Sequence, residues 1–133
     1  MYEYLPHTAD LKIRIKGNNL EDIFVESLKA LNNFLDPEKG DKKIEKNIEL
    51  SSKDLILLYI DFLSEILSLT YTEKMVFDIK EIKIVKNEEI TLEAILNGTE
   101  YKSLKKDIKA ITYHQAKIEK EDDKYISEFI IDV

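Results

Sequence analysis

The spacing of hydrophobic residues divides the chain into segments with strand or helix periodicity. Residues 11–16 alternate strictly between apolar and cationic side chains, which is typical of a strand with one buried face. Asp10 directly precedes this segment and falls by the same alternation on its polar face. Residues 1–5 are short and aromatic and lead into a proline, so we expect an edge strand or an extended lead-in there.

Helical spacing occurs in two places. Apolar residues recur with a helical period over residues 20–35, after Asn19, whose side chain suits an N-cap. A second helix is predicted at about residues 53–72, after Ser51 and Asp54 in capping-box spacing. This second helix is apolar on nearly every side, so it is either a core element or a surface for another chain, and we expect the core. Its polar residues form one narrow stripe: Asp54, Asp61, Glu65 and Ser68.

The remaining segments predict strands and their connections. Lys46 interrupts the apolar positions of its segment, and a change of phase within residues 75–84 indicates a β-bulge. The next strand is expected to end at Asn97-Gly98, a common turn dipeptide, with a loop over residues 100–107. The predicted strands are residues 44–50, 75–84, 90–96, 108–119 and 125–133, the last two joined by a charged turn at 120–123.

The predicted order is therefore β-β-α-β-α-β-β-β-β. This order is typical of an α+β fold, here one mixed, mostly antiparallel sheet with two helices packed on one face. The chain has 133 residues, of which 44% are hydrophobic and 35% charged. Such a length and composition predict a single domain over residues 1–133 with one core and a charged surface.

Composition excludes several functional classes. A net charge of −7 argues against a protein that binds the phosphate backbone of nucleic acids over a broad surface, so DNA is not an expected partner. Without cysteine there are no disulfides and no thiolate metal sites. With only 3 glycines the chain has no phosphate-binding loop and no dinucleotide fingerprint, and it contains no Gly-x-Ser-x-Gly nucleophile motif.

We expect a cytoplasmic protein with no membrane contact. The N-terminal segment has no charged-then-apolar export signal. The longest apolar run, Leu55 to Leu69, is interrupted by Asp61 and Glu65 and is interpreted as too short to span a membrane.

Carboxylates near the two ends of the chain form the candidate site. If the strand after Asp10 and the strand ending at Asp132 are antiparallel neighbours, these residues share a corner with the terminal carboxylate of Val133. Clusters of oxygen ligands suit Ca²⁺, Mg²⁺ or Mn²⁺. A single Asp at a strand end is commonly a turn residue or a cap, so the pair alone leaves both interpretations open.

Three further residues are candidates for supporting roles. His7 adjoins the Asp10 corner, and His114 lies within a predicted strand; either can orient a ligand, although a lone histidine is more often structural. Lys109 lies on a strand that we expect beside the last one. Its ammonium can partly neutralise the carboxylates or bind a phosphate there. Alternatively, Lys109 is an ordinary lysine on the solvent-exposed face of a strand.

Three blocks, taken together and in order, resemble the archease family over nearly the whole chain. Each block is moderately specific, and the combination is much more so. The blocks are Pro6-His7-Thr8-Ala9-Asp10 followed by Gly17 and residues 20–24; Asp54, Leu58, residues 62–67 and Thr72-Glu73; and residues 109–114 with residues 130–133.

The resemblance implies an accessory protein and not an enzyme. Its implied partner is an RtcB-type RNA ligase in tRNA splicing and RNA repair, whose GTP-dependent guanylylation and multiple turnover it promotes through a bound divalent cation. The implied metal positions are Asp10, Asp132 and Val133, with His7 and Lys109 in support. The nucleotide then belongs to the ligase, and tRNA is reached through the ligase.

The sequence departs from the family pattern at a few positions and leaves an alternative open. Phe62 stands where relatives commonly carry Trp, Tyr71 where an Asp is expected, and residues 105–107 lack the usual His and Gly. The alternative is a chaperone-like or specificity-modifying partner of an RNA-modifying enzyme, such as a tRNA methyltransferase. A stand-alone hydrolase is disfavoured because no positioned base or nucleophile accompanies the two carboxylates.

Overall fold

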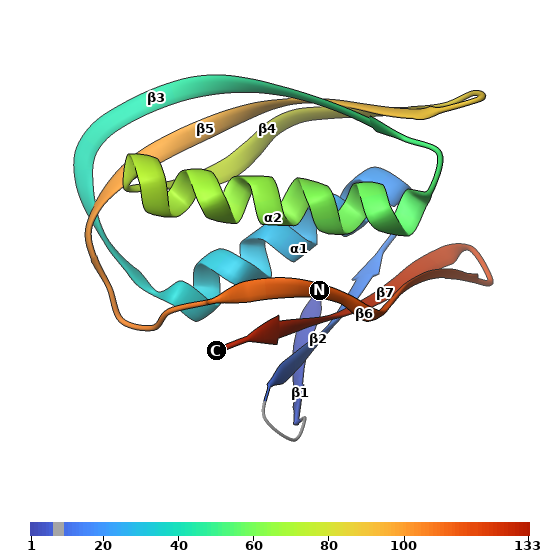
Figure 1. Ribbon diagram of the computed structural model, residues 1–133, viewed down its shortest axis with the longest axis horizontal. Helices are drawn as coiled ribbons and strands as arrows, with labels where there is room; N and C mark the ends of the chain where they lie inside the picture. Colours follow the sequence, from blue (N-terminus) through green and yellow to red (C-terminus); the bar gives the residue numbers. More distant parts are fainter. Residues whose placement is uncertain (7–9) are drawn as a thin grey trace.

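Two antiparallel sheets enclose a layer of helices in the part of the chain that the structure describes (Figure 1). The computed structural model describes residues 1–6 and 10–133. Sheet A has the strand order β1-β2-β7-β6, and sheet B has the order β3-β5-β4. The elements are β1 (Tyr2–Pro6), β2 (Leu11–Gly17), α1 (Leu20–Leu35), β3 (Pro37–Ser52), α2 (Leu55–Glu73), β4 (Met75–Lys86), β5 (Ile90–Leu104), β6 (Ala110–Glu121) and β7 (Lys124–Asp132).

The α+β class, the element order and the antiparallel pairing are confirmed, but the prediction of one sheet is wrong. The strands separate into sheet A below and sheet B above the helix layer (Figure 1). Alternation in a sequence tells which face of a strand is buried, whereas it does not tell which strands are neighbours. The helices therefore cover one face of each sheet and not one face of a single sheet.

A side chain caps each helix: α1 begins where the sequence predicted, and α2 begins at Leu55, two residues later than predicted, with Asp54 and not Ser51 as its N-cap. The amide of Asp22 donates to Asn19 Oδ1 at 2.8 Å at the start of α1. The amides of Ile56 and Leu57 donate to Asp54 Oδ1 at 2.8 and 3.2 Å at the start of α2. Such caps satisfy backbone donors that have no partner inside the helix.

The position of α2 between the sheets explains why it is apolar almost all round. Apart from Thr72 and Glu73 in its last turn, its exposed residues form the single stripe of Leu57, Asp61, Glu65 and Ser68, so the prediction of a core helix is confirmed. By length and composition alone, the 19 residues of α2 are apolar enough to cross a membrane. The helix extends beyond the apolar run Leu55 to Leu69 that the sequence singled out, and burial between two sheets accounts for its composition. Its buried residues are Leu58, Tyr59, Ile60, Phe62, Leu63, Ile66, Leu67 and Thr70.

A chain of buried hydroxyl groups ties the helix layer to sheet A. Tyr59 on α2 is fully buried, and its hydroxyl lies 3.0 Å from Ser127 Oγ on β7. On its other side it contacts the hydroxyl of Ser27 on α1, which donates to the carbonyl of Ile23 at 2.6 Å. Burial raises the pKa of Tyr59, while its serine partners act in the opposite direction. The phenol is therefore a neutral hydrogen-bonding group that joins three elements.

The predicted turn at Asn97-Gly98 is wrong, because β5 runs straight through it to Leu104. Much of the predicted loop over residues 100–107 is therefore strand. A Cβ at Gly98 would lie 2.8 Å from the ring of buried Phe77 and 2.9 Å from Ile44. Glycine is required here for close packing and not for a turn.

Two other sequence features are explained by the pairing in sheet B. The register of β4 against β5 shifts between Ile79 and Glu81, which confirms the predicted bulge. Lys46 pairs with buried Leu96 and so lies on the inward-facing row of β3. Its ammonium binds Glu73 at the C-terminal end of α2, which accounts for a cation at an apolar position.

Replacing Tyr59 by Phe should destabilise the protein by about 1–3 kcal/mol, because the hydroxyls of Ser27 and Ser127 lose their buried partner. Urea unfolding of wild type and Tyr59→Phe measures this difference. The matched control is Tyr125→Phe, which removes a hydroxyl from a half-buried tyrosine on β7 and should cost less than about 0.5 kcal/mol. Equal losses in the two variants would show that the buried hydroxyl chain has no special importance.

Gly98→Ala should cost about 1–3 kcal/mol, because the new methyl group overlaps the Phe77 ring. A double-mutant cycle with Phe77→Leu checks the cause, since the smaller side chain leaves room for the methyl group. The cost of Gly98→Ala should be clearly smaller in the Phe77→Leu background. An identical cost in both backgrounds would mean that the glycine serves a purpose other than packing against Phe77.

Candidate functional site

The pairing of β2 with β7 brings the two predicted carboxylates to one corner. The strands are antiparallel, with Leu11 opposite Ile131. Asp10 directly precedes Leu11 and Asp132 directly follows Ile131, so both residues lie at the same end of this ladder, as the sequence predicted. Asp10 is half-buried and Asp132 is exposed, and Val133 next to it is 43% exposed.

Lys109 approaches the same corner from the other side of β7. Its backbone amide donates to the carbonyl oxygen of Asp132 at 2.7 Å, directly before the pairing of Ala110 with Asp132. The side chain of Lys109 is exposed. The structure thus places Lys109 beside the carboxylate pair, while His7 lies outside the described residues.

The donor groups of the corner are chemically suited to a hard cation. Carboxylate oxygens, together with backbone carbonyls and water, are the usual ligands of Ca²⁺, Mg²⁺ and Mn²⁺. Within residues 1–6 and 10–133, no group of three or more His, Asp or Glu side chains is arranged to hold a metal. A site at this corner would accordingly depend on Asp10, Asp132 and the oxygens of Val133.

His114 does not belong to this corner, because β6 bulges before reaching it. Thr112 pairs with Ile130 and Lys117 with Glu128, so residues 113–116 lie outside the ladder. Gln115 has a positive φ of 61° within this bulge, an unusual conformation for a side chain with a Cβ. The sequence carried a signal for it, since Ile111 and Ile118 both pack toward the core although their spacing is odd.

The bulge directs Tyr113 toward the start of α2. Its hydroxyl donates to Asp54 Oδ2 at 3.1 Å, while Oδ1 of the same carboxylate caps the helix. This hydrogen bond raises the pKa of Tyr113. The amide of Leu57, followed by Tyr113 and Ile56, lowers the pKa of Asp54 against a smaller opposing effect of burial. Asp54 is therefore a structural residue that links α2 to β6.

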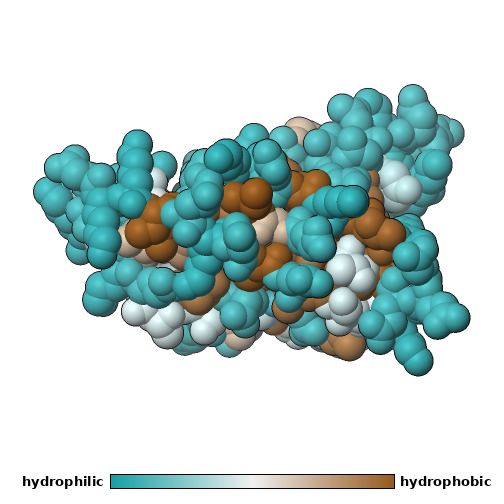
Figure 2. Space-filling model, turned by 90° about the horizontal axis from the view of Figure 1, so that it is seen from above, coloured by the Kyte–Doolittle hydropathy of each residue, from teal (hydrophilic) through white to brown (hydrophobic). Residues whose placement is uncertain are grey.

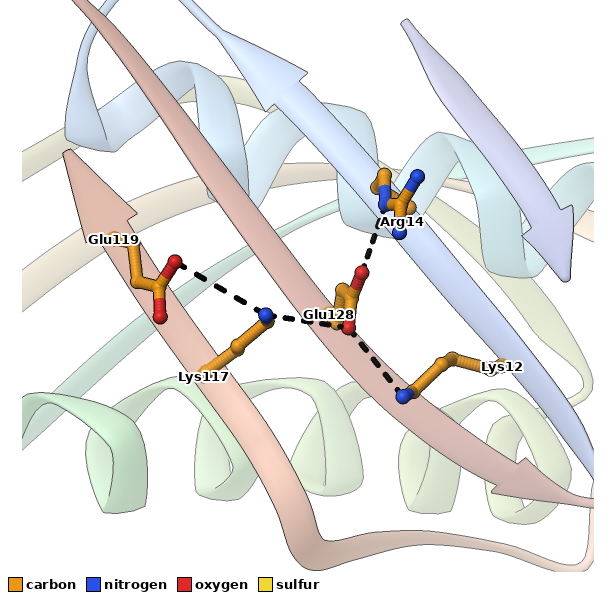
Figure 3. A network of polar contacts seen from close by, with 5 residues as sticks. All are labelled: Lys12, Arg14, Lys117, Glu119 and Glu128. Atoms are coloured by element: carbon orange, nitrogen blue, oxygen red, sulfur yellow. Dashed lines mark hydrogen bonds and ion pairs between the residues drawn. The ribbon is translucent and has the colours of Figure 1, made fainter. Parts of the chain in front are cut away.

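A charged cluster on the outer face of sheet A was not predicted (Figure 3). Glu128 on β7 is only 4% exposed, although its strand face points away from the helices. Its carboxylate accepts from Arg14 Nε at 2.8 Å and lies 3.4 Å from Lys12 Nζ and 3.6 Å from Lys117 Nζ. Lys117 also lies 4.0 Å from Glu119.

The cations around Glu128 decide its protonation. Burial by itself would raise the pKa of Glu128, but the hydrogen bond from Arg14 and the charges of Lys117 and Lys12 outweigh burial and lower it. The hydrogen bond to Glu128 in turn raises the pKa of Arg14. The cluster therefore holds a charged carboxylate that fastens β7 to both of its neighbours.

A hollow on the described surface of sheet B lies away from the corner. It has a volume of about 650 Å³ and is lined by residues 47–49, 81–83 and 93–95 of sheet B. The face seen from above Figure 1, where sheet B lies, is mostly hydrophilic with hydrophobic side chains between (Figure 2). Glu49, Glu81 and Glu93 line the hollow, and nothing about it indicates a ligand.

These observations define a small α+β protein with a helix layer between two sheets and a carboxylate corner between β2 and β7. The model of the Archease protein family matches residues 2–133. The chain therefore belongs to the archease family, and the resemblance seen in the sequence is confirmed.

Curated relatives match over almost their full length. The chain is 32% identical to protein archease of Methanosarcina mazei, covering 99% of this chain and 95% of that protein. It is 35% identical to protein archease of Pyrococcus abyssi, covering 99% and 98%. A protein archease-like of Dictyostelium discoideum is 31% identical, with 99% and 93% covered.

Solved structures share the fold. The solution structure of protein 1598 of Methanobacterium thermoautotrophicum has a TM-score of 0.83 and 26% identity, covering 99% of this chain and 98% of that one. The crystal structure of an archease, possible chaperone, from Thermotoga maritima has a TM-score of 0.70 and 22% identity, covering 100% and 98%. The second likeness concerns the fold alone.

The lowered pKa of Glu128 predicts a loss of stability in acid. A carboxylate whose folded pKa is depressed stabilises the fold above its unfolded pKa of about 4.3, and this contribution is lost as the pH falls through the folded pKa. Urea unfolding of wild type at pH 7 and at decreasing pH below about 4.5 should show the loss. Glu128→Gln should have a smaller pH dependence in the same range.

The matched control is Glu119→Gln, since Glu119 lies in the same cluster but its side chain is 62% exposed. This variant should keep the pH dependence of wild type. Parallel curves for wild type and Glu128→Gln would contradict the assignment of the effect to Glu128.

Proposed function

We propose that this protein is an accessory factor that activates an RtcB-type RNA ligase in tRNA splicing and RNA repair. It promotes the GTP-dependent guanylylation of the ligase and its multiple turnover, and it acts through a divalent cation at the corner of Asp10 and Asp132. The observation that supports the proposal is the β2–β7 ladder of an archease-family member, whose end pair Leu11–Ile131 directly adjoins Asp10 and Asp132.

The residues of the corner have distinct roles in this proposal. Asp10 and Asp132 provide carboxylate oxygens, and Val133 provides backbone or terminal oxygens. Lys109, whose amide binds the Asp132 carbonyl at 2.7 Å, orients this end of β7 and places an ammonium beside the corner. His7, three residues before Asp10 in the sequence, contributes to the surroundings of the cation in this proposal. The bound cation would supply positive charge that neutralises phosphate oxygens during guanylylation.

The nucleotide and the RNA belong to the ligase in this proposal. The sequence has no glycine-rich phosphate loop, and its net charge of −7 disfavours a broad RNA-binding surface. The protein is expected to act in the cytoplasm, as a partner of the ligase and without catalytic residues of its own. Its exposed corner is the part that would meet the ligase active site.

A chaperone-like role is the second candidate. It is favoured by the description of the Thermotoga maritima relative as a possible chaperone. The apolar surface of the second helix suited this role when the sequence was considered alone, but most of it is buried between the sheets. Among the described residues of α2, Leu57 is the large hydrophobic side chain that remains exposed. A partner of an RNA-modifying enzyme such as a methyltransferase would need the fold and not the carboxylate pair.

Guanylylation of the cognate ligase by GTP, at substoichiometric accessory protein, tests the proposal. Asp10→Asn and Asp132→Asn should each lower the stimulation at least about tenfold, because each removes a charged ligand while keeping the side-chain shape. Substitution is a better test than chelation, since GTP itself reacts as a metal complex.

The control for this assay is Asp123→Asn, which changes an exposed carboxylate in the β6–β7 turn and should stimulate like wild type. Calorimetric titration of the isolated proteins with Ca²⁺ or Mn²⁺ should show binding that both corner variants lose. Full stimulation by both folded variants would overturn the metal-dependent mechanism and leave the chaperone-like role. No stimulation by wild type would overturn ligase activation itself.

A further inference from the structure

One narrow face of α2 stays uncovered although the helix lies between two sheets. Its exposed side chains Leu57, Asp61, Glu65 and Ser68 follow one another at intervals of three or four residues, so they form a single row along the helix. We call this row the α2 stripe. From Leu57 to Ser68 it extends about 16 Å along the helix axis. Figure 1 shows α2 in front of α1 and above β6.

Tyr113 of β6 extends the apolar end of the α2 stripe. Asp54 joins the two, because its Oδ2 accepts from the Tyr113 hydroxyl at 3.1 Å and its Oδ1 accepts from the amide of Leu57 at 3.2 Å. The exposed fraction is 42% for Leu57 and 49% for Tyr113. Single exposed hydrophobic residues are ordinary on a protein surface, whereas neighbouring ones are typical of a contact surface.

The bulge of β6 allows Tyr113 to reach this place. Residues 113–116 leave the β6–β7 ladder, and Gln115 adopts a left-handed backbone conformation with a φ of 61°. This conformation is unfavourable for a residue with a Cβ, and a regular strand would keep the ladder hydrogen bonds. Bulges commonly redirect a side chain at a functional position. The irregular pairing therefore favours a role for Tyr113 at the surface.

The rest of the α2 stripe carries negative charge. Asp61 lies one turn beyond Leu57 and Glu65 one turn further, about 6 Å per step. With the residues that the structure describes, neither carboxylate forms a hydrogen bond or an ion pair. Lys46, a cation that reaches α2, binds Glu73 at the other end of the helix. Like charges four residues apart slightly destabilise a helix, so this pair of carboxylates does not serve the stability of α2.

The charge of the α2 stripe discriminates between possible occupants. The phosphates of RNA would be repelled by Asp61 and Glu65. In a twofold dimer built on this face, the stripe would meet its own copy, so like charges would oppose each other. A partner helix with an apolar residue followed by cations one and two turns away matches the row, since packed helices align side chains at this spacing.

We propose that the α2 stripe and Tyr113 form a docking surface for a basic amphipathic helix of the partner protein. An apolar side chain of that helix packs on Leu57 and Tyr113, and its Lys or Arg side chains pair with Asp61 and Glu65. The identification of the partner as an RtcB-type ligase rests on the proposed function. The surface lies on other elements than the carboxylate corner, so it contributes affinity for the partner and not the chemistry of guanylylation.

Guanylylation of the cognate ligase by GTP, measured over a range of accessory-protein concentrations, tests this surface. Asp61→Lys/Glu65→Lys should raise the concentration for half-maximal stimulation at least about tenfold, because like charges then face the partner. Leu57→Gln should raise it at least about threefold through lost apolar contact. The maximal stimulation should stay that of wild type, whereas Asp10→Asn and Asp132→Asn lower the maximum.

The matched control is Glu88→Lys/Glu89→Lys, which makes the same change of net charge in the exposed β4–β5 turn. It should leave the half-maximal concentration within about twofold of wild type, because distant charges are screened by salt. An equal shift in both charge reversals would reveal a general charge effect and overturn the docking surface. If circular dichroism shows that the reversal in α2 disturbs the fold, Asp61→Asn/Glu65→Gln tests the same contact with an expected shift of about threefold.

The salt dependence of binding tests the chemistry of the partner. Calorimetric titration of wild type with the ligase should give a lower affinity as the ionic strength rises from about 0.05 to 0.3 M. Asp61→Asn/Glu65→Gln should bind more weakly at low salt and depend less on salt. Equal salt dependence of the two proteins would contradict a cationic partner surface at Asp61 and Glu65.

The remaining outcomes distinguish this inference from the proposed function. Stripe variants that bind and stimulate the ligase at wild-type concentrations overturn the docking surface, while activation of the ligase stands. Absence of both binding and stimulation by wild type overturns ligase activation and this surface as a contact for the ligase. Self-association of wild type in analytical ultracentrifugation that Leu57→Gln abolishes would assign the stripe to a second copy of the chain and overturn the partner helix.

Discussion

The antiparallel pairing of β2 with β7 is the constraint on which most of the structure depends. It joins segments more than a hundred residues apart in the sequence, between Leu11 and Ile131 at one end and Gly17 and Tyr125 at the other. Toward the helices, this pair presents Ile13, Ile15 and Phe129, all fully buried. Toward solvent, it sets Arg14 opposite Glu128 and continues to the pair of Asp10 and Asp132. The core and the candidate site are therefore the two faces of one ladder.

The helix layer depends on both sheets in the same way. α2 buries apolar side chains in nearly every direction, so one sheet could cover only part of it. Sheet A contacts it through β6 and through the hydrogen bond of Ser127 with Tyr59, whereas sheet B packs against it from the other side. A hydrophobic helix of this length is stable in water only when such surfaces enclose it. The same enclosure removes most of α2 as an apolar surface for a partner.

The outer face of sheet A is held together by a nearly buried carboxylate. Its central carboxylate, Glu128, fastens β7 to β2 through Arg14 and to β6 through Lys117. A buried carboxylate with cationic partners is a costly arrangement that an apolar residue can often replace without loss of stability.

The sequence by itself determined the local structure and much of the candidate site. Helical period and caps are encoded within a few neighbouring residues, so α1 was predicted at residues 20–35 and α2 to within two residues at its start. Alternation placed Asp10 on the polar face of its strand. The sequence analysis assumed that the strand after Asp10 and the strand ending at Asp132 are antiparallel neighbours, and from this it followed that the two carboxylates lie at the same corner. The sequence blocks shared with the archease family pointed to the same residues.

Only the tertiary structure decided which strands share a sheet and which side chains become buried against distant partners. Gly98 has the sequence of a turn, but the Phe77 ring from another strand makes it a packing residue. Lys46 and Glu128 have the sequence of surface residues, but Glu73 and Arg14 make them parts of buried or half-buried pairs. These contacts join residues far apart in the chain, and no local pattern of polarity specifies them.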